Sequence, residues 1–93
     1  MNTWFDRVAA LGCVICRELG HGIVQAEVHH VAEGSGLRSD YAVAGLCPEH
    51  HRGGSGLHGM GTKAFCSLYR LPGEAEWGLL VLVNKYLSKG DMK

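Results

Sequence analysis

The cysteines and histidines of this chain fall into short groups whose spacing is typical of metal sites. The chain of 93 residues contains four cysteines and six histidines. Most of them lie in three groups, which are Cys13 with Cys16, His29 with His30, and Cys47 with His50, His51 and His58. Thiolates and imidazoles are preferred ligands of Zn²⁺ and similar ions, so the groups predict metal chemistry. They can supply two ions, one that holds the fold together and one left open for catalysis.

The first predicted site combines a C-x-x-C pair with a C-x-x-H pair. Its ligands would be Cys13, Cys16, Cys47 and His50. Four such ligands fill a tetrahedral zinc ion, which then stabilises the fold and performs no chemistry. Using His51 instead would give a C-x-x-x-H spacing, and spacing alone leaves that choice open. The alternative is two unrelated pairs, with unligated buried cysteines and surface histidines.

Adjacent histidines at the end of a predicted strand indicate a second, open site. Side chains alternate between the two faces of a strand, so His29 and His30 cannot both bind one ion without strain. One would bind the ion and the other would act as a general base beside it, because imidazole titrates near neutrality. His51 and His58 would complete the ligands and leave positions open for water. The alternative is a histidine pair that lies on the surface by accident.

The segment between His50 and Gly73 contains no Asp or Glu, although Arg52, Lys63 and Arg70 lie within it. A segment without acids around a cation site suits a phosphate, and Arg52 and Lys63 are the candidate contacts. The alternative is an ordinary solvated face, because three basic residues are a weak signal.

The predicted strands explain how the histidines are presented. Residues 23–31 are rich in β-branched side chains and contain no breaker, which predicts a strand ending at the histidine pair. A loop over residues 33–40 leads to a second short strand over 41–46, which we expect to pair antiparallel with the first. Gly53, Gly54 and Gly56 make the following segment a flexible link.

Helices are predicted on both sides of this hairpin. The first spans residues 4–11 with Thr3 as its cap and Gly12 at its end. A second, capped by Thr62, runs to residue 69 and buries Cys66 as a small core residue. The last spans 73–88, where Glu74 and Glu76 in the first turn match the helix dipole. Its apolar residues cover most of its circumference, which predicts extensive burial or a dimer contact. His21 is expected in an exposed loop.

Length and composition predict one small domain over residues 1–93. A chain of this size buries a modest core, so a structural metal would help it fold. The first residues lack the basic and apolar regions of a signal peptide, which favours a reducing cytoplasm. The apolar run over residues 77–83 is much shorter than a membrane span, so we expect a soluble protein that does not enter membranes. The formal net charge is zero, which gives no support to a large polyanionic partner.

Taken in order, these groups resemble the HNH, or His-Me finger, endonuclease superfamily with its ββα-metal fold. The run from His51 to Gly61 resembles the small phage recombination-enhancement, RecA-dependent nucleases within it. The resemblance covers about residues 10–70. It implies an α+β fold with a ββα core and a zinc knuckle, flanked by an N-terminal and a C-terminal helix.

The resemblance also assigns roles to individual residues. His30 matches the general base that activates water, and His29 and His51 match ligands of the active-site ion. His50 takes the place of the knuckle's second cysteine, which assigns it rather than His51 to the structural Zn²⁺. His58 would be a further ligand or a phosphate contact. The catalytic ion would be Mg²⁺ or Mn²⁺, with Zn²⁺ possible in the isolated protein.

The activity implied is that of a metal-dependent DNA endonuclease or nickase that hydrolyses phosphodiester bonds. Ala42 stands where the superfamily has an asparagine that orients the base, so Asp40 or a backbone carbonyl would have to serve. A neutral chain attracts DNA weakly, and a recombination protein or a second copy would supply affinity. One alternative is a non-catalytic zinc module that binds nucleic acid or protein. Another is a metal hydrolase acting on other substrates.

Overall fold

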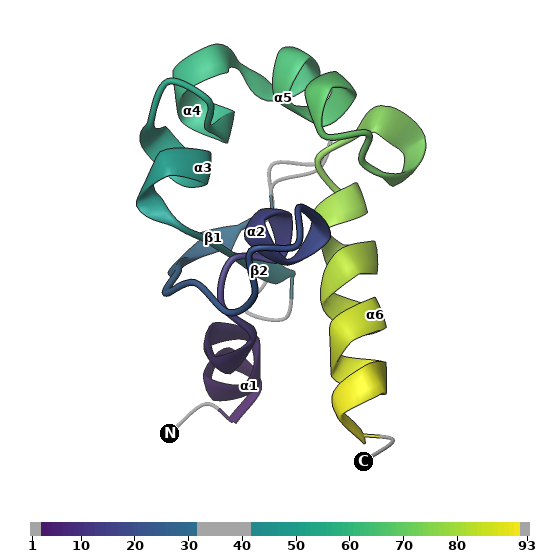
Figure 1. Ribbon diagram of the computed structural model, residues 1–93. Coiled ribbons are helices and arrows are strands. Elements are labelled where there is room, and N and C mark those ends of the chain that lie inside the picture. Colours follow the sequence, from purple (N-terminus) through teal and green to yellow (C-terminus); the bar gives the residue numbers. More distant parts are fainter. Residues whose placement is uncertain (1–2, 32–41, 92–93) are drawn as a thin grey trace.

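The chain forms a small α+β structure in which helices surround a two-stranded sheet (Figure 1). The computed structural model describes residues 3–31 and 42–91. The elements within these ranges are α1 (Thr3–Leu11), α2 (Val14–Glu18), β1 (Glu27–His30), β2 (Val43–Leu46), α3 (Pro48–Arg52), α4 (Leu57–Met60), α5 (Thr62–Leu68), the 3-10 turn η1 (Pro72–Glu74) and α6 (Gly78–Asp91). The predicted loop over residues 33–40, with Asp40, lies outside the described residues.

The two strands pair antiparallel, as the sequence predicts, with Glu27 opposite Leu46 and His30 opposite Val43. The prediction that the first strand begins at residue 23 is wrong. The N–H of Cys13 donates to the Val24 carbonyl at 2.9 Å, so that part of the chain pairs with the α1–α2 turn instead of with β2. All four residues of β2 are buried, because α1 contacts the strand and α2 and α6 also pack against it.

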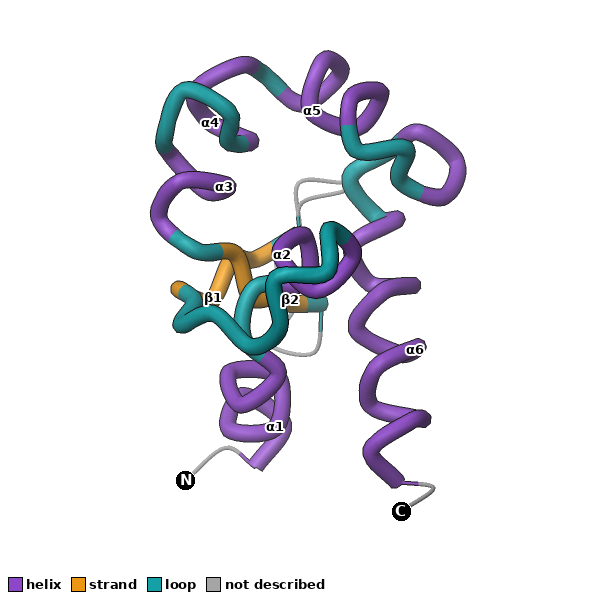
Figure 2. Tube along the Cα trace, viewed as in Figure 1, coloured by secondary structure: helices purple, strands orange, loops and turns teal. Residues whose placement is uncertain are grey.

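The segment after β2 forms an arch of short helices, α3, α4 and α5, beyond one edge of the sheet (Figure 2). Two of these helices, α3 and α4, were not predicted, because their residues were expected to form only a cluster of metal ligands and a flexible link. The residues that cap them, Cys47 and Gly56, have extended backbone conformations. Such short helices depend on packing rather than on intrinsic propensity, which explains why the sequence pattern did not predict them.

The prediction that the last helix begins at residue 73 is wrong. Pro72 opens a 3-10 turn in which Gly73 and Glu74 have positive φ angles of 72° and 48°. The α-helix therefore starts only at Gly78, and Glu76 lies before it rather than in its first turn. This shift matters because it leaves the Glu76 carboxylate able to reach the sheet.

Helix α6 covers the core with one face rather than with its whole circumference. Leu79, Leu82 and Val83 are buried, whereas Val81 is 41% exposed. Near its end, the Tyr86 hydroxyl and Lys85 Nζ both donate to the Glu18 carboxylate of α2. The same helix therefore closes the core and holds the first cysteine-bearing helix.

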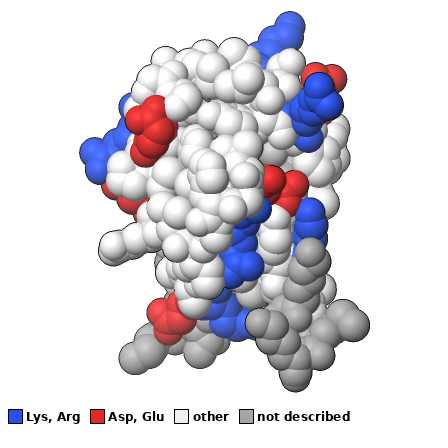
Figure 3. Space-filling view, viewed as in Figure 1, with Lys and Arg blue, Asp and Glu red and all other residues white. Residues whose placement is uncertain are grey.

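Charged side chains of both signs alternate over the face of the molecule in Figure 3, and they do not gather into one basic surface there. Within residues 3–31 and 42–91, no helix has the length and apolar character needed to cross a membrane.

The α1–α2 turn lies directly against β2, and two glycines make this approach possible. A Cβ atom added to Gly45 would lie 2.5 Å from the Gly12 carbonyl oxygen, which is far inside contact distance. Gly12 itself has a φ of 73°. Because Cys13 follows one glycine directly and Cys47 follows the other by two residues, this contact brings the two cysteines together.

We expect Gly45→Ala to lower the free energy of unfolding by about 1–3 kcal/mol, because the new methyl group must displace backbone. Gly54→Ala is the matched control, since a Cβ atom there would meet nothing within 4 Å. Denaturant unfolding of the metal-loaded proteins measures both. Equal stability of the two variants would show that the turn can move away from β2 without cost.

Candidate metal centres

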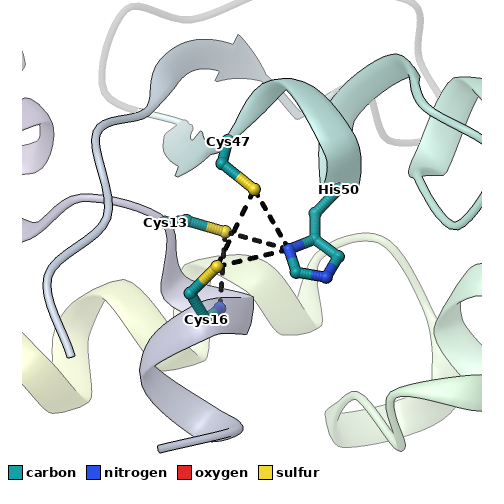
Figure 4. A group of neighbouring side chains, drawn as sticks. All are labelled: Cys13, Cys16, Cys47 and His50. Atoms are coloured by element: carbon teal, nitrogen blue, oxygen red, sulfur yellow. Dashed lines mark hydrogen bonds between the residues drawn. The ribbon is translucent and has the colours of Figure 1, made fainter. Parts of the chain in front are cut away.

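Four side chains from two helix N-termini converge on one point (Figure 4). Cys13 is the N-cap of α2, and its sulfur accepts the N–H of Cys16 at 3.4 Å. Cys47 is the N-cap of α3, and His50 lies one turn into that helix. All four residues are buried, and their ligand atoms lie within 4.8 Å of one another. The structure thus brings together the four residues that the sequence predicts for the closed site.

The distances within this Cys3His cluster match the edges of a zinc tetrahedron. With Zn–S of about 2.3 Å and Zn–N of about 2.0 Å, two sulfurs should lie about 3.8 Å apart and a sulfur and a nitrogen about 3.5 Å apart. The Cys16 and Cys47 sulfurs are 3.7 Å apart. His50 Nδ1 lies 3.5 Å from the Cys13 and Cys16 sulfurs and 3.2 Å from that of Cys47. The cluster can therefore bind a metal ion such as zinc.

Burial favours the uncharged forms of Cys13, Cys16 and His50 when no cation is among them. It raises the pKa of Cys13 and lowers the pKa of His50. Burial, with the thiols of Cys13 and Cys47, raises the pKa of Cys16 to about 12. A cation at the centre would reverse this preference for the two cysteines, because it stabilises thiolates directly, and it would keep His50 neutral.

A second cluster consists of His29 from β1, His51 from α3 and His58 from α4, with ligand nitrogens within 4.8 Å of one another. His29 Nδ1 and His51 Nε2 are 3.3 Å apart. Two nitrogens at that separation, each about 2.1 Å from an ion, would subtend an angle of about 100° at it. The three-histidine cluster could therefore hold a metal ion.

In two of these histidines, the ring nitrogen that is not part of the His29–His51 contact is hydrogen-bonded to a carboxylate. Glu76 Oε2 lies 2.8 Å from His29 Nε2, and Glu27 Oε1 lies 2.8 Å from His51 Nδ1. Hydrogen bonds from His51 and Arg52 lower the pKa of Glu27, whereas burial is the largest cause of the lowered pKa of His29. Carboxylates in this position orient metal-binding histidines.

The sequence analysis missed both carboxylates. Glu27 could have been found, because it lies two residues before His29 and therefore on the same face of the strand. Glu76 lies 47 residues from His29, and the sequence predicted it in the first turn of the last helix. No local pattern indicates its contact with the sheet.

The link before His58 has fixed partners in the structure. The Glu49 carboxylate accepts hydrogen bonds from the backbone N–H of Ser55, at 3.0 Å, and from its hydroxyl group. The Tyr69 hydroxyl donates to the Ser55 carbonyl at 2.9 Å, while the Tyr69 ring packs edge-on against His50. These contacts join the segment that carries His58 to the Cys3His cluster.

The remaining predicted site residues lie around the three-histidine cluster or away from it. His30 is half-buried, and its ring packs edge-on against Phe5 of α1 with centroids 5.8 Å apart. It belongs to neither cluster that the described residues form. Arg52 is exposed and forms an ion pair with Glu27, and Lys63 is exposed on α5.

The two residues assigned no metal role lie as predicted. Cys66 is fully buried in the core. His21 is exposed, and its backbone N–H donates to the Cys16 carbonyl at 2.8 Å. Neither belongs to a cluster in the described part of the chain.

Comparison with known proteins identifies the family. A family model described as recombination enhancement, RecA-dependent nuclease matches residues 2–77. The chain belongs to this family. No curated protein and no solved structure matches it. The predicted resemblance to the recombination-enhancement nucleases is confirmed, and the family name indicates an enzyme that acts on nucleic acid in recombination.

The matched region of this recombination-enhancement nuclease contains both clusters and both carboxylates. Helix α6, which begins at Gly78, lies beyond it. The family match therefore covers the residues that build the candidate sites, while α6 lies outside the matched residues.

Loss of one ligand should disable the Cys3His cluster. We expect Cys47→Ala to remove most of the thiolate-to-metal absorption of the cobalt-loaded protein. We also expect it to lower stability by about 3 kcal/mol or more, a fall in Tm of about 12–24 °C. Cys66→Ala is the matched control, because it removes a buried thiol outside the cluster and should keep the absorption. Unchanged absorption in Cys47→Ala would exclude Cys47 as a ligand.

Proposed function

We propose that this protein is a metal-dependent DNA endonuclease or nickase of the HNH type. Its ββα-metal core would consist of β1, β2 and α3. The observation that carries the proposal is the convergence of the His29, His51 and His58 nitrogens at the strand that also carries His30. A cluster of nitrogen ligands with two supporting carboxylates suits an ion that keeps positions open for water and phosphate.

The proposed reaction is hydrolysis of a phosphodiester. His30, the last residue of β1, accepts a proton from water as the water oxygen bonds to phosphorus. The bond from phosphorus to the 3′ oxygen breaks, and that oxygen takes up a proton from solvent. His29, His51 and His58 would hold a divalent ion, Mg²⁺ or Mn²⁺, which would supply positive charge next to the phosphate. The Phe5 ring packs against the His30 imidazole from the α1 side.

Contacts to DNA phosphates are assigned to Arg52 and Lys63. Arg52 follows His51 directly and keeps its side chain 66% exposed while it pairs with Glu27. Binding through so few cations would be weak and sensitive to salt. The proposal therefore includes a partner that supplies DNA affinity. The family name points to RecA as that partner, and a second copy of the chain is the alternative.

The competing function is a non-catalytic zinc module that binds nucleic acid or protein. The closed Cys3His cluster alone would serve such a module, because four ligands leave no position for substrate. Three converging histidines with carboxylate partners have no purpose in that scheme. A hydrolase of non-nucleic-acid substrates would use the same open ion, but a nuclease family does not favour it.

Nicking of supercoiled plasmid tests the proposal. We expect cleavage that requires Mg²⁺ or Mn²⁺ and that increases when RecA is added to the reaction, because RecA would supply DNA affinity. His30→Ala should lower the rate by about 10²–10⁴-fold, because it removes the general base. His21→Ala is the matched control and should cleave like the wild type, since His21 is an exposed loop histidine outside both clusters.

The outcomes separate the candidate functions. Equal cleavage by His30→Ala and His21→Ala would remove His30 as the base. Absence of cleavage by the wild type with every metal, with and without RecA, would favour the zinc module. Activity on an ester or amide that DNA does not inhibit would favour the other hydrolase.

A further inference from the structure

We propose that Glu76 and Glu27 are positioning residues, which select the nitrogen that His29 and His51 each present to the active-site ion. Glu76 would make Nδ1 the ligand atom of His29, and Glu27 would make Nε2 the ligand atom of His51. This inference rests on the proposed function. It assigns a role in that site to a carboxylate that lies outside the ββα core.

The contact between Glu76 and His29 is shielded from water. Their side chains are 13% and 8% exposed, and Glu76 Oε2 lies 2.8 Å from His29 Nε2. A carboxylate accepts hydrogen bonds, so Nε2 must carry the proton that is shared with it. In neutral imidazole the other nitrogen, Nδ1, then has only its lone pair to offer.

In His51 the carboxylate contacts the other ring nitrogen, Nδ1. Glu27 Oε1 lies 2.8 Å from its Nδ1, which leaves the lone pair on Nε2. The two unprotonated nitrogens, His29 Nδ1 and His51 Nε2, then face each other at 3.3 Å. Two acceptors at this distance repel unless positive charge lies between them. The carboxylates therefore create, from two neutral histidines, a position that favours a cation.

The turn before α6 fixes Glu76 in place. A Cβ atom on Gly78 would lie 2.6 Å from the Pro72 carbonyl oxygen, so the two ends of this turn are in contact. The N–H of Gly78 donates to the Ala75 carbonyl at 2.9 Å, and that of Leu79 donates to the Glu76 carbonyl at 3.0 Å. Leu79 is fully buried. The carboxylate is thus attached to the core through α6 rather than carried on a loose segment.

Glu76 gives the cleaner test of the two carboxylates. Glu27 also binds Arg52, a proposed DNA contact, so its removal would change two things at once. Glu74 offers a matched control for Glu76, because it lies two residues away in the same turn, is exposed and carries the same charge. Glu76→Gln keeps an oxygen that can accept from Nε2 and serves as the conservative variant.

The experiment titrates Mn²⁺ into full-length protein whose Cys3His cluster already holds zinc, with binding measured by calorimetry. Nitrogen NMR of the imidazoles before Mn²⁺ is added reports which nitrogen of His29 carries the proton. We expect Glu76→Ala to bind Mn²⁺ about 10–100-fold more weakly than Glu74→Ala. Its His29 should change from the Nε2-protonated form to a mixture of both forms. Glu76→Gln should recover part of the affinity and most of the Nε2-protonated form.

Two further variants distinguish this inference from the proposed function. If wild type and His29→Ala bind Mn²⁺ equally, the three-histidine site itself is wrong and the proposed function fails with it. If wild type binds Mn²⁺ and nicks DNA but Glu76→Ala matches Glu74→Ala in affinity and in protonation of His29, only the positioning role is overturned. Retained zinc in every variant shows that the fold is intact.

Discussion

The meeting of Cys13, Cys16, Cys47 and His50 is the constraint on which the rest of the structure depends. It joins α2 to α3, two helices of five residues each. Helices of that length are not stable alone, so their positions come from tertiary contacts. Burial raises the pKa of the Cys13 and Cys16 thiols. A cation among the four side chains would favour thiolates and so attract the two helices to each other. Close contact between Gly12 and Gly45 brings the two halves within reach of each other.

Helix α3 transmits this constraint to the second centre. His50 and His51 are neighbours on one helix and therefore point about 100° apart, one toward the cysteines and one toward His29. A shift of the helix at one cluster must move the ligand of the other. Tyr69 strengthens the connection, because its ring contacts His50 and its hydroxyl holds the segment before His58. The two clusters are thus connected through α3 and Tyr69.

Much of both clusters could be predicted from the sequence because short spacings restrict geometry. Two cysteines or a cysteine and a histidine three positions apart can reach one ion from a single turn, whatever the rest of the chain does. The antiparallel hairpin followed from β-branched runs on either side of a loop. The prediction for Cys66 was also correct, because a cysteine among apolar neighbours behaves as a core residue.

The features that sequence reasoning missed depend on contacts between distant segments. Residues 23–26 look like strand, yet the N–H of Cys13 pairs with Val24. Pro72 and Gly73 delay the last helix, although the residues that follow have good helical character. Hydrogen bonds from Ser55 to Glu49 give order to a glycine-rich segment that composition alone describes as flexible. In each case a tertiary partner overrides the local preference of the chain.

The hydrogen bond between Glu76 and His29 also bears on where the working unit of this protein ends. The recognisable pattern of ligands is complete at His58, and a shortened chain designed around that pattern would retain every one of them. Such a chain would lose Glu76, the turn that carries it and the helix that anchors the turn. With the proposed role of Glu76, the working unit would extend at least 47 residues beyond His29. A design that transfers these ligands to another scaffold would also need a carboxylate hydrogen-bonded to His29 Nε2, as Glu76 is here.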